Sequence, residues 1–226
     1  MTRILAVSDE VEDSLYGADL KAMGLDLIVS CGDLPFDYLE GLVTLANVPL
    51  MYVPGNHDPD LRHRPQEVSP EDILKPISFG RNEGDTPGPE GCLNIDGRVT
   101  DAAGMRIAGL GGSMRYTQGP NQYTQSEMTR RAIALEARAR LGSLMTRRSK
   151  PARHLEVLLT HSPPLGVGDD DDPCHEGFAA FHRLVERLSP SVLLHGHIHP
   201  YGRQVEELQI DETRIINTVG HRLIEV

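Results

Sequence analysis

The sequence predicts an α/β fold, because apolar runs rich in Val, Ile and Leu alternate with segments of helical character. The strand-like runs are residues 3–8, 26–31, 49–53, 105–110, 155–160 and 191–195. The chain has 226 residues, a length that fits one domain with a substantial buried core. We therefore expect a single domain over residues 1–226.

Helices are predicted between these strands, over residues 13–23, 37–47, 126–148 and 176–188. The last segment carries apolar residues three or four positions apart, namely Phe178, Phe181, Leu184, Val185 and Leu188. This spacing places them on one face of a helix, so we interpret them as core residues.

The segment 126–148 is polar and rich in arginine, and it has two interpretations. The charge pattern favours a solvated helical face whose arginines pair with Glu127 and Glu136. Alternatively, the segment belongs to a helical cap inserted near residues 113–150, and its arginines meet an anionic substrate.

The pattern changes after residue 200, where strand-like runs 203–209, 213–218 and 222–226 follow one another without a helix between them. Consecutive strands joined by short turns pair antiparallel, so these runs should extend or face the main sheet. A stretch rich in Gly and Pro at residues 80–91 is predicted to be a surface loop.

Composition and charge exclude several classes of protein. The formal net charge of −11 argues against a broad basic surface for nucleic acid. The apolar stretch at residues 1–7 is too short for a signal peptide or a membrane span. Three cysteines without CxxC spacing suggest no disulfide framework. We expect a cytoplasmic protein with no membrane partner.

Side chains able to bind metal follow five of the strand-like runs, at the point where each run ends. They are Asp9, Asp33, Asn56, His161, His197 and His199. In open α/β sheets, ligands bind outside the carboxyl ends of the strands, so these side chains could converge. Each has a structural explanation when taken alone, such as a helix cap, a turn or a hydrogen-bonded histidine. Their occurrence together and in order favours a metal site.

The donor set comprises two carboxylates, one amide oxygen and three imidazoles. Such mixed nitrogen and oxygen ligands suit Mn, Fe, Zn or Ni, whereas calcium prefers oxygen alone. A carboxylate can bridge two cations, and two ions roughly 3.5–4 Å apart can hold a hydroxide and neutralise an in-line displacement. The set therefore suits the hydrolysis of a phosphoester.

The order of these residues resembles the sequence blocks of the calcineurin-like metallophosphoesterases, in particular of small bacterial members. The blocks of that family run D-x-H, GD, GNH followed by D or E, H, and GHxH. This chain supplies Asp9, Gly32-Asp33, Gly55-Asn56-His57-Asp58, His161 and Gly196-His197-Ile198-His199. The resemblance implies a four-layer α/β/β/α sandwich, in which two mixed sheets face each other and helices flank them.

The resemblance also implies ligands for two divalent ions, and we expect Mn ahead of Fe, Zn or Ni. Asp33 would bridge the two ions. The first ion would be held by Asn56, His161 and His197, and the second by Asp9 and His199.

Two further residues of the GNHD block acquire roles from the resemblance. His57 would be the catalytic histidine, which stabilises or protonates the departing oxygen. An imidazole that titrates near neutral pH suits such a transfer. Asp58 is expected to support the site through local hydrogen bonds.

The sequence departs from the family pattern in its first block, where Val11 stands at the position of the histidine. Valine cannot bind a metal, so the ion held by Asp9 and His199 loses an expected ligand. Glu10 or Glu12 could bend inward, or water could fill the place. We expect this ion to bind more weakly, or the metal preference to shift toward Mn.

These observations predict a phosphodiesterase or phosphomonoesterase that acts by attack of a metal-bridging hydroxide. The acidic balance favours a small phosphorylated substrate over nucleic acid. Two alternatives remain: a nuclease, as in the DNA-repair branch of the family, and a non-catalytic scaffold, as in a retromer subunit with this fold.

Substrate choice would depend on three loops around the predicted site, residues 80–91, 113–125 and 165–175. Such loops often carry function. Arg115 could bind a phosphate or anchor its own loop, and His175 could line the pocket.

Overall fold

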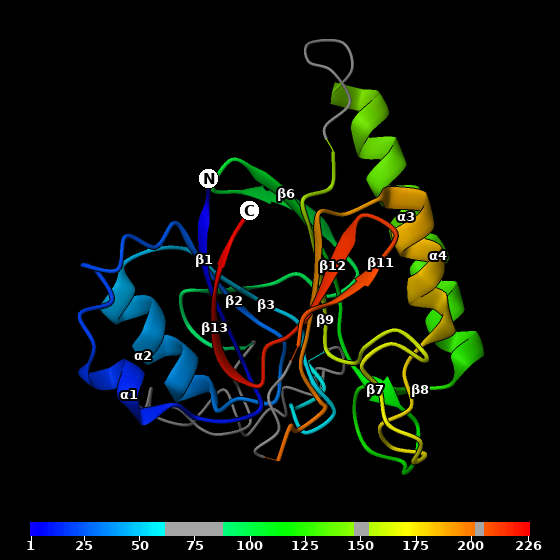
Figure 1. Ribbon diagram of the computed structural model, residues 1–226, viewed down its shortest axis with the longest axis horizontal. Helices are drawn as coiled ribbons and strands as arrows, with labels where there is room; N and C mark the ends of the chain where they lie inside the picture. Colours follow the sequence, from blue (N-terminus) through cyan, green and yellow to red (C-terminus); the bar gives the residue numbers. More distant parts are fainter. Residues whose placement is uncertain (62–87, 147–153, 202–205) are drawn as a thin grey trace, which may run out of the picture.

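The computed structural model describes residues 1–61, 88–146, 154–201 and 206–226, which form two mixed β-sheets with flanking helices (Figure 1). The first sheet has the strand order β13 (Gly220–Glu225), β1 (Arg3–Ser8), β2 (Leu27–Ser30), β3 (Leu50–Tyr52) and β4 (Cys92–Asn94). The second has the order β11 (Leu208–Ile210), β12 (Thr213–Asn217), β10 (Val192–His195), β9 (Val157–Thr160), β6 (Met105–Leu110) and β5 (Val99–Ala102). The short strands β7 (Ser113–Met114) and β8 (Gln122–Tyr123) pair with each other.

The central strands of each sheet run parallel. In the first sheet β1, β2, β3 and β4 are parallel, and β13 pairs antiparallel with β1. In the second sheet β6, β9, β10 and β12 are parallel, while the edge strands β5 and β11 are antiparallel to their neighbours. The loops after the parallel strands of a sheet therefore leave it at one edge.

Each central strand contributes to two layers of the core, because successive side chains of a strand point to opposite faces of the sheet. In β1, Ile4 and Ala6 belong to a buried cluster that contains residues of both sheets, such as Ile107 of β6. Leu5 and Val7 belong instead to a cluster with the helices of the first sheet. Both faces of the strand are thus buried, which explains its continuous apolar run.

Helices cover the outer face of each sheet, as Figure 1 shows. On the first sheet lie α1 (Asp13–Gly17) and α2 (Phe36–Ala46), which contribute Leu15 and Leu42 to its outer core. On the second lie α3 (Gln125–Thr146) and α4 (Ala179–Leu188), which contribute Leu135 and Leu184. The predicted α/β/β/α sandwich is confirmed.

The described residues of α3 belong to the outer layer of the sandwich. Met128, Ala132 and Leu135 are fully buried against the second sheet. On the same helix Glu136 pairs with Arg140 at 2.9 Å. Glu136 is buried and also pairs with Arg183 of α4 at 2.7 Å, and the apolar contacts pack the described residues of α3 against the second sheet.

Two predicted elements need correction, and two strands were not predicted. The helix predicted over 13–23 ends at Gly17, because Ala18 takes an extended backbone with φ −83° and ψ 147°. The strands β4 and β5 were not predicted, since residues such as Asn94 and Asp101 interrupt any apolar run. Of the run predicted over 203–209, the described part contains only the start of β11 at Leu208.

Most of the loop predicted over 80–91 lies outside the described residues, as do residues 202–205. In the described part of the chain, no helix is long and apolar enough to cross a membrane.

Candidate metal centre

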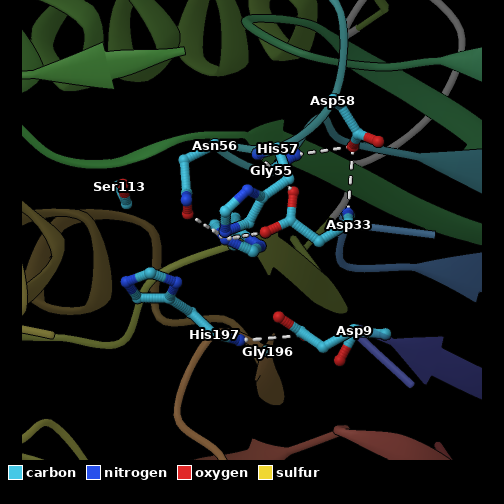
Figure 2. A network of polar contacts seen from close by, with 12 residues as sticks. Asp9, Asp33, Gly55, Asn56, His57, Asp58, Ser113, Gly196 and His197 are labelled. Atoms are coloured by element: carbon cyan, nitrogen blue, oxygen red, sulfur yellow. Dashed lines mark hydrogen bonds and ion pairs between the residues drawn. The ribbon is translucent and has the colours of Figure 1, made fainter. Parts of the chain in front are cut away.

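Four side chains able to bind metal meet where the carboxyl edges of the two sheets adjoin. Asp9 and Asp33 follow β1 and β2 of the first sheet, while His161 and His197 follow β9 and β10 of the second. One ligand atom from each lies within 4.8 Å of the other three. Figure 2 shows Asp9, Asp33 and His197 around the shared space. The predicted convergence is therefore found for these four residues.

Three of the four residues have a left-handed backbone, which is unusual for residues other than glycine. The φ angles are 59° at Asp9, 58° at Asp33 and 68° at His197. Each such conformation costs on the order of 1–3 kcal/mol and persists only where the surrounding structure enforces it. The turns at the strand ends are thus strained, and they direct these side chains toward one another.

His161 lies at the centre of the cluster and is fully buried. Its Nδ1–H donates to the carbonyl oxygen of Cys31 at 2.7 Å. Its Nε2 lies 3.0 Å from Asn56 Oδ1 and 3.3 Å from Asp33 Oδ2. The backbone contact fixes the orientation of the ring, so Nε2 is the nitrogen presented to the cluster.

The acid–base properties of the cluster favour a positive charge among its carboxylates. Burial lowers the pKa of His161, but the carboxylates of Asp33 and Asp9 and the contact with Cys31 together outweigh it and raise the pKa to about 9. Burial raises the pKa of Asp33, yet the charge and hydrogen bond of His161 and the N–H of His57 together lower it below its usual value. Burial also raises the pKa of Asp9. A cation among these residues would stabilise the ionised carboxylates and displace the proton of His161.

His197 is held as a neutral imidazole. Its backbone N–H donates to Asp9 Oδ2 at 3.0 Å, and its Nε2 contacts the carbonyl oxygen of Cys174 at 2.8 Å. Burial lowers the pKa of His197 to about 3, and the charge of His161 acts in the same direction. Since Nε2–H donates to Cys174, the neutral ring has Nδ1 as its unprotonated nitrogen.

Asn56 joins the cluster through its amide oxygen and contacts Tyr116 through its amide nitrogen. Its Oδ1 faces His161, and its Nδ2–H donates to Tyr116 Oη at 3.2 Å. Asn56 is buried, whereas Tyr116 is 43 % exposed and lines the cavity over the site. Sequence reasoning did not single out Tyr116, because its only signal was membership of the loop 113–125.

The turn at Gly55 is clamped by backbone contacts. Asp58 Oδ2 accepts the N–H of Asp33 at 3.0 Å and of Gly55 at 2.8 Å (Figure 2). Asn121 Nδ2 donates to the carbonyl oxygens of Gly55 and Asp58, both at 3.0 Å. Burial raises the pKa of Asp58 to about 6, although both N–H donors lower it. The supporting role expected of Asp58 is confirmed.

His57 lies at the surface of the cluster and lines the cavity. Its backbone N–H donates to Asp33 Oδ1 at 2.8 Å, so this residue also helps to orient the Asp33 carboxylate. Among the described residues, the side chain of His57 forms no ion pair with the carboxylate of Asp9 or of Asp33. The residue lines the cavity, where it can meet a bound molecule.

His199 lines the same cavity but does not join the cluster of four. Its Nδ1 lies 2.9 Å from Glu10 Oε1. Val11, at the position of the missing histidine, is 45 % exposed. Of the two acidic residues considered as substitutes, the structure places Glu10 beside His199.

The cavity over the cluster has a volume of about 340 Å³. Polar and titratable residues line most of it: Asp9, Asp33, Asn56, His57, Tyr116, Cys174, His175, His197 and His199. The expectation that His175 lines the pocket is confirmed. Cys174 also lies on the wall, and its carbonyl oxygen supports His197.

Arg115 anchors its own loop. Its guanidinium donates to the carbonyl oxygen of Gln122 at 3.1 Å and pairs with Glu127 at 2.9 Å. Arg115 does not line the cavity, so of the two roles left open for it the structure supports the structural one.

The residues present fit a divalent transition metal. A buried group of two carboxylates, one amide oxygen and two imidazoles offers both hard oxygen and borderline nitrogen ligands. Second contacts to backbone groups orient both imidazoles, as is usual in metal sites. The raised pKa of His161 indicates a place where a cation is favourable.

Residues 6–201 match the family described as Calcineurin-like phosphoesterase. Among curated proteins, no match to this sequence was found.

Several solved structures resemble the fold of this chain. One crystal structure aligns with a TM-score of 0.59 and 15 % identity, covering 99 % of this chain and 98 % of the other. The protein TT1561 of Thermus thermophilus aligns with a TM-score of 0.57 and 18 % identity, covering 97 % and 89 %. A single mutant of Vps29 from Entamoeba histolytica aligns with a TM-score of 0.40 and 13 % identity, covering 96 % and 73 %.

Proposed function

This chain belongs to the calcineurin-like phosphoesterase family, and from that membership and its metal centre we propose that it is a metal-dependent phosphoric ester hydrolase. The observation that carries the proposal is the meeting of Asp9 and Asp33 from one sheet with His161 and His197 from the other. The three strained φ angles support it, because strain concentrates where function requires a particular geometry.

Divalent ions bound by the cluster would polarise the phosphoryl group and lower the pKa of an attacking water. The chain itself supplies the positioning. Asp33 is held between the two sheets by the N–H of His57 and the ring of His161. Asn56 is held between His161 and Tyr116. These contacts keep the ligands in place before substrate arrives, which lowers the cost of organising the transition state.

His57 is proposed as the catalytic residue. Its imidazole lines the cavity next to the proposed ligand Asn56, with no carboxylate partner among the described residues. A leaving oxygen develops negative charge as the phosphorus–oxygen bond breaks. An imidazolium can donate a proton to that oxygen, which completes the displacement.

The proposed substrate is a small phosphorylated molecule. A volume of about 340 Å³ suits a compact ligand. The net charge of −11 disfavours long nucleic acid, which binds largely through basic side chains. The nuclease and the non-catalytic scaffold remain the alternatives, and each has a distinct experimental signature.

The proposal is tested by stripping the purified chain with a chelator and reloading it separately with Mn, Fe, Ni, Zn or Mg. We expect hydrolysis of bis-p-nitrophenyl phosphate or p-nitrophenyl phosphate to disappear on stripping and return with at least one metal, Mn first. Elemental analysis counts the ions. One ion per chain without hydrolysis in any metal would favour the scaffold, and salt-dependent DNA binding with cleavage would favour the nuclease.

Replacing Tyr116 with Phe is expected to lower kcat/KM by about ten- to hundredfold, the value of one charge-assisted hydrogen bond. Tyr116 Oη accepts a hydrogen bond from Asn56, so its own proton can be donated to a phosphoryl oxygen in the cavity. Steady-state kinetics with bis-p-nitrophenyl phosphate measures the effect, and metal content should not change.

The matched control is Tyr16→Phe. Tyr16 is 46 % exposed, close to the 43 % of Tyr116, and lies in α1 on the outer face of the first sheet. It should retain full activity. Equal kinetics in the two variants would exclude a role for the Tyr116 hydroxyl in binding phosphate.

A further inference from the structure

Strand β1 ends in a sharp turn centred on Asp9. The N–H of Glu10 donates to the carbonyl oxygen of Ser8 at 2.6 Å, and the φ angle of Asp9 is 59°. This three-residue turn breaks the alternation of the strand. The side chain of Glu10 therefore does not follow the direction that a continued strand would give it.

The turn brings Glu10 to His199, which lies 189 positions away in the sequence. Glu10 Oε1 and His199 Nδ1 are 2.9 Å apart. Two ligands of one transition metal, each at roughly 2.0–2.2 Å and at about a right angle, also lie about 3 Å apart. The separation of the pair is therefore compatible with two ligands of a shared ion.

The pair adjoins the metal centre already described. Asp9, Asp33 and His199 line one cavity, and Glu10 follows Asp9 directly. Oδ2 of Asp9 accepts the N–H of His197, so Asp9 joins the turn at Glu10 to the metal centre. The Glu10–His199 pair thus offers an oxygen donor and a nitrogen donor beside the metal centre.

We propose that Glu10 is a ligand of this second ion and replaces the histidine that is missing at Val11. Glu12 does not serve, because its carboxylate lies near Gly220 and 3.9 Å from His221 Nδ1. The inference rests on the proposed function only in requiring that the centre bind divalent metal.

The exchange of imidazole for carboxylate changes the chemistry of the second site. With Glu10 the second ion would have three candidate carboxylate ligands, from Glu10, Asp9 and Asp33, and one candidate imidazole, from His199. Carboxylate-rich sites suit Mn and Mg, whereas imidazole-rich sites suit Zn. The second ion of this chain should therefore be Mn in preference to Zn.

The experiment is calorimetric titration of the metal-free chain with Mn²⁺, with elemental analysis of the product. Wild type should bind two Mn²⁺ ions per chain. Glu10→Gln should bind the first ion normally and the second at least about tenfold more weakly, since loss of even an outer contact to a ligand costs 10–100-fold. Glutamine keeps the size of the side chain and can still accept a hydrogen bond from His199.

The matched control is Glu12→Gln, the same change two residues along, which should bind both ions as wild type does. Two equally tight ions in Glu10→Gln would overturn the proposal, because Glu10 would then only form an ion pair. A single ion in wild type would overturn it as well. Failure of wild type to bind any divalent metal would instead count against the proposed function.

Discussion

Replacing His57 with Ala is expected to lower the turnover of bis-p-nitrophenyl phosphate by about 10²–10⁴-fold, the usual contribution of one general acid. The side chain of His57 lines the cavity but is not one of the four residues that converge on the metal site. Its backbone contact to Asp33 Oδ1 survives the substitution. Metal content should therefore remain that of wild type.

The control for this variant is His154→Ala. His154 is exposed and contacts Ser191 at 3.3 Å, outside the metal centre, so its loss should leave turnover unchanged. Elemental analysis and steady-state kinetics distinguish the outcomes. Unchanged turnover in His57→Ala would remove the acid from the mechanism, and loss of metal would make His57 a ligand.

Replacing Gly55 with Ala is expected to lower activity by roughly 100-fold or more, because displacement of catalytic groups by about 1 Å can have that effect. A Cβ at this position would overlap the Asp33 carboxylate and lie 2.7 Å from His161 Cε1. Asp58 and Asn121 hold the turn from the other side, so Gly55 cannot move away freely. One added methyl group should therefore displace two ligands.

Metal titration and thermal unfolding separate the causes of this loss. Overpacking of this kind typically lowers the free energy of unfolding by about 1–3 kcal/mol. Gly17→Ala provides the control, since a Cβ there would meet no atom within 4 Å. Wild-type metal affinity and turnover in Gly55→Ala would contradict the close approach that defines the centre.

Much of the fold was predictable because its strands are buried on both faces. The runs 3–8 and 105–110 coincide with β1 and β6, since both layers of the sandwich demand apolar side chains there. Elements under weaker hydrophobic constraint were missed. The strands β4 and β5 are half exposed, so no apolar pattern marks them.

The residues that converge on the site were predictable because they follow predicted strands. Each proposed ligand follows a predicted strand, and the carboxyl ends of parallel strands meet at one edge of a sheet. Tyr116 escaped prediction because its significance lies in a contact with Asn56, 60 positions earlier. No local pattern records such a contact.

The sequence by itself determined the architecture and the identity of the converging residues. Hydrophobic period and residue order are local properties, and they suffice to place Asp9, Asp33, His161 and His197 at strand ends. Only the tertiary structure decided what surrounds them. The turn at Asp9 brings Glu10 next to His199. A carboxylate is therefore available where the family pattern has a histidine and this chain has Val11. That outcome depends on a backbone angle and on the packing of two distant loops, which no one-dimensional pattern encodes.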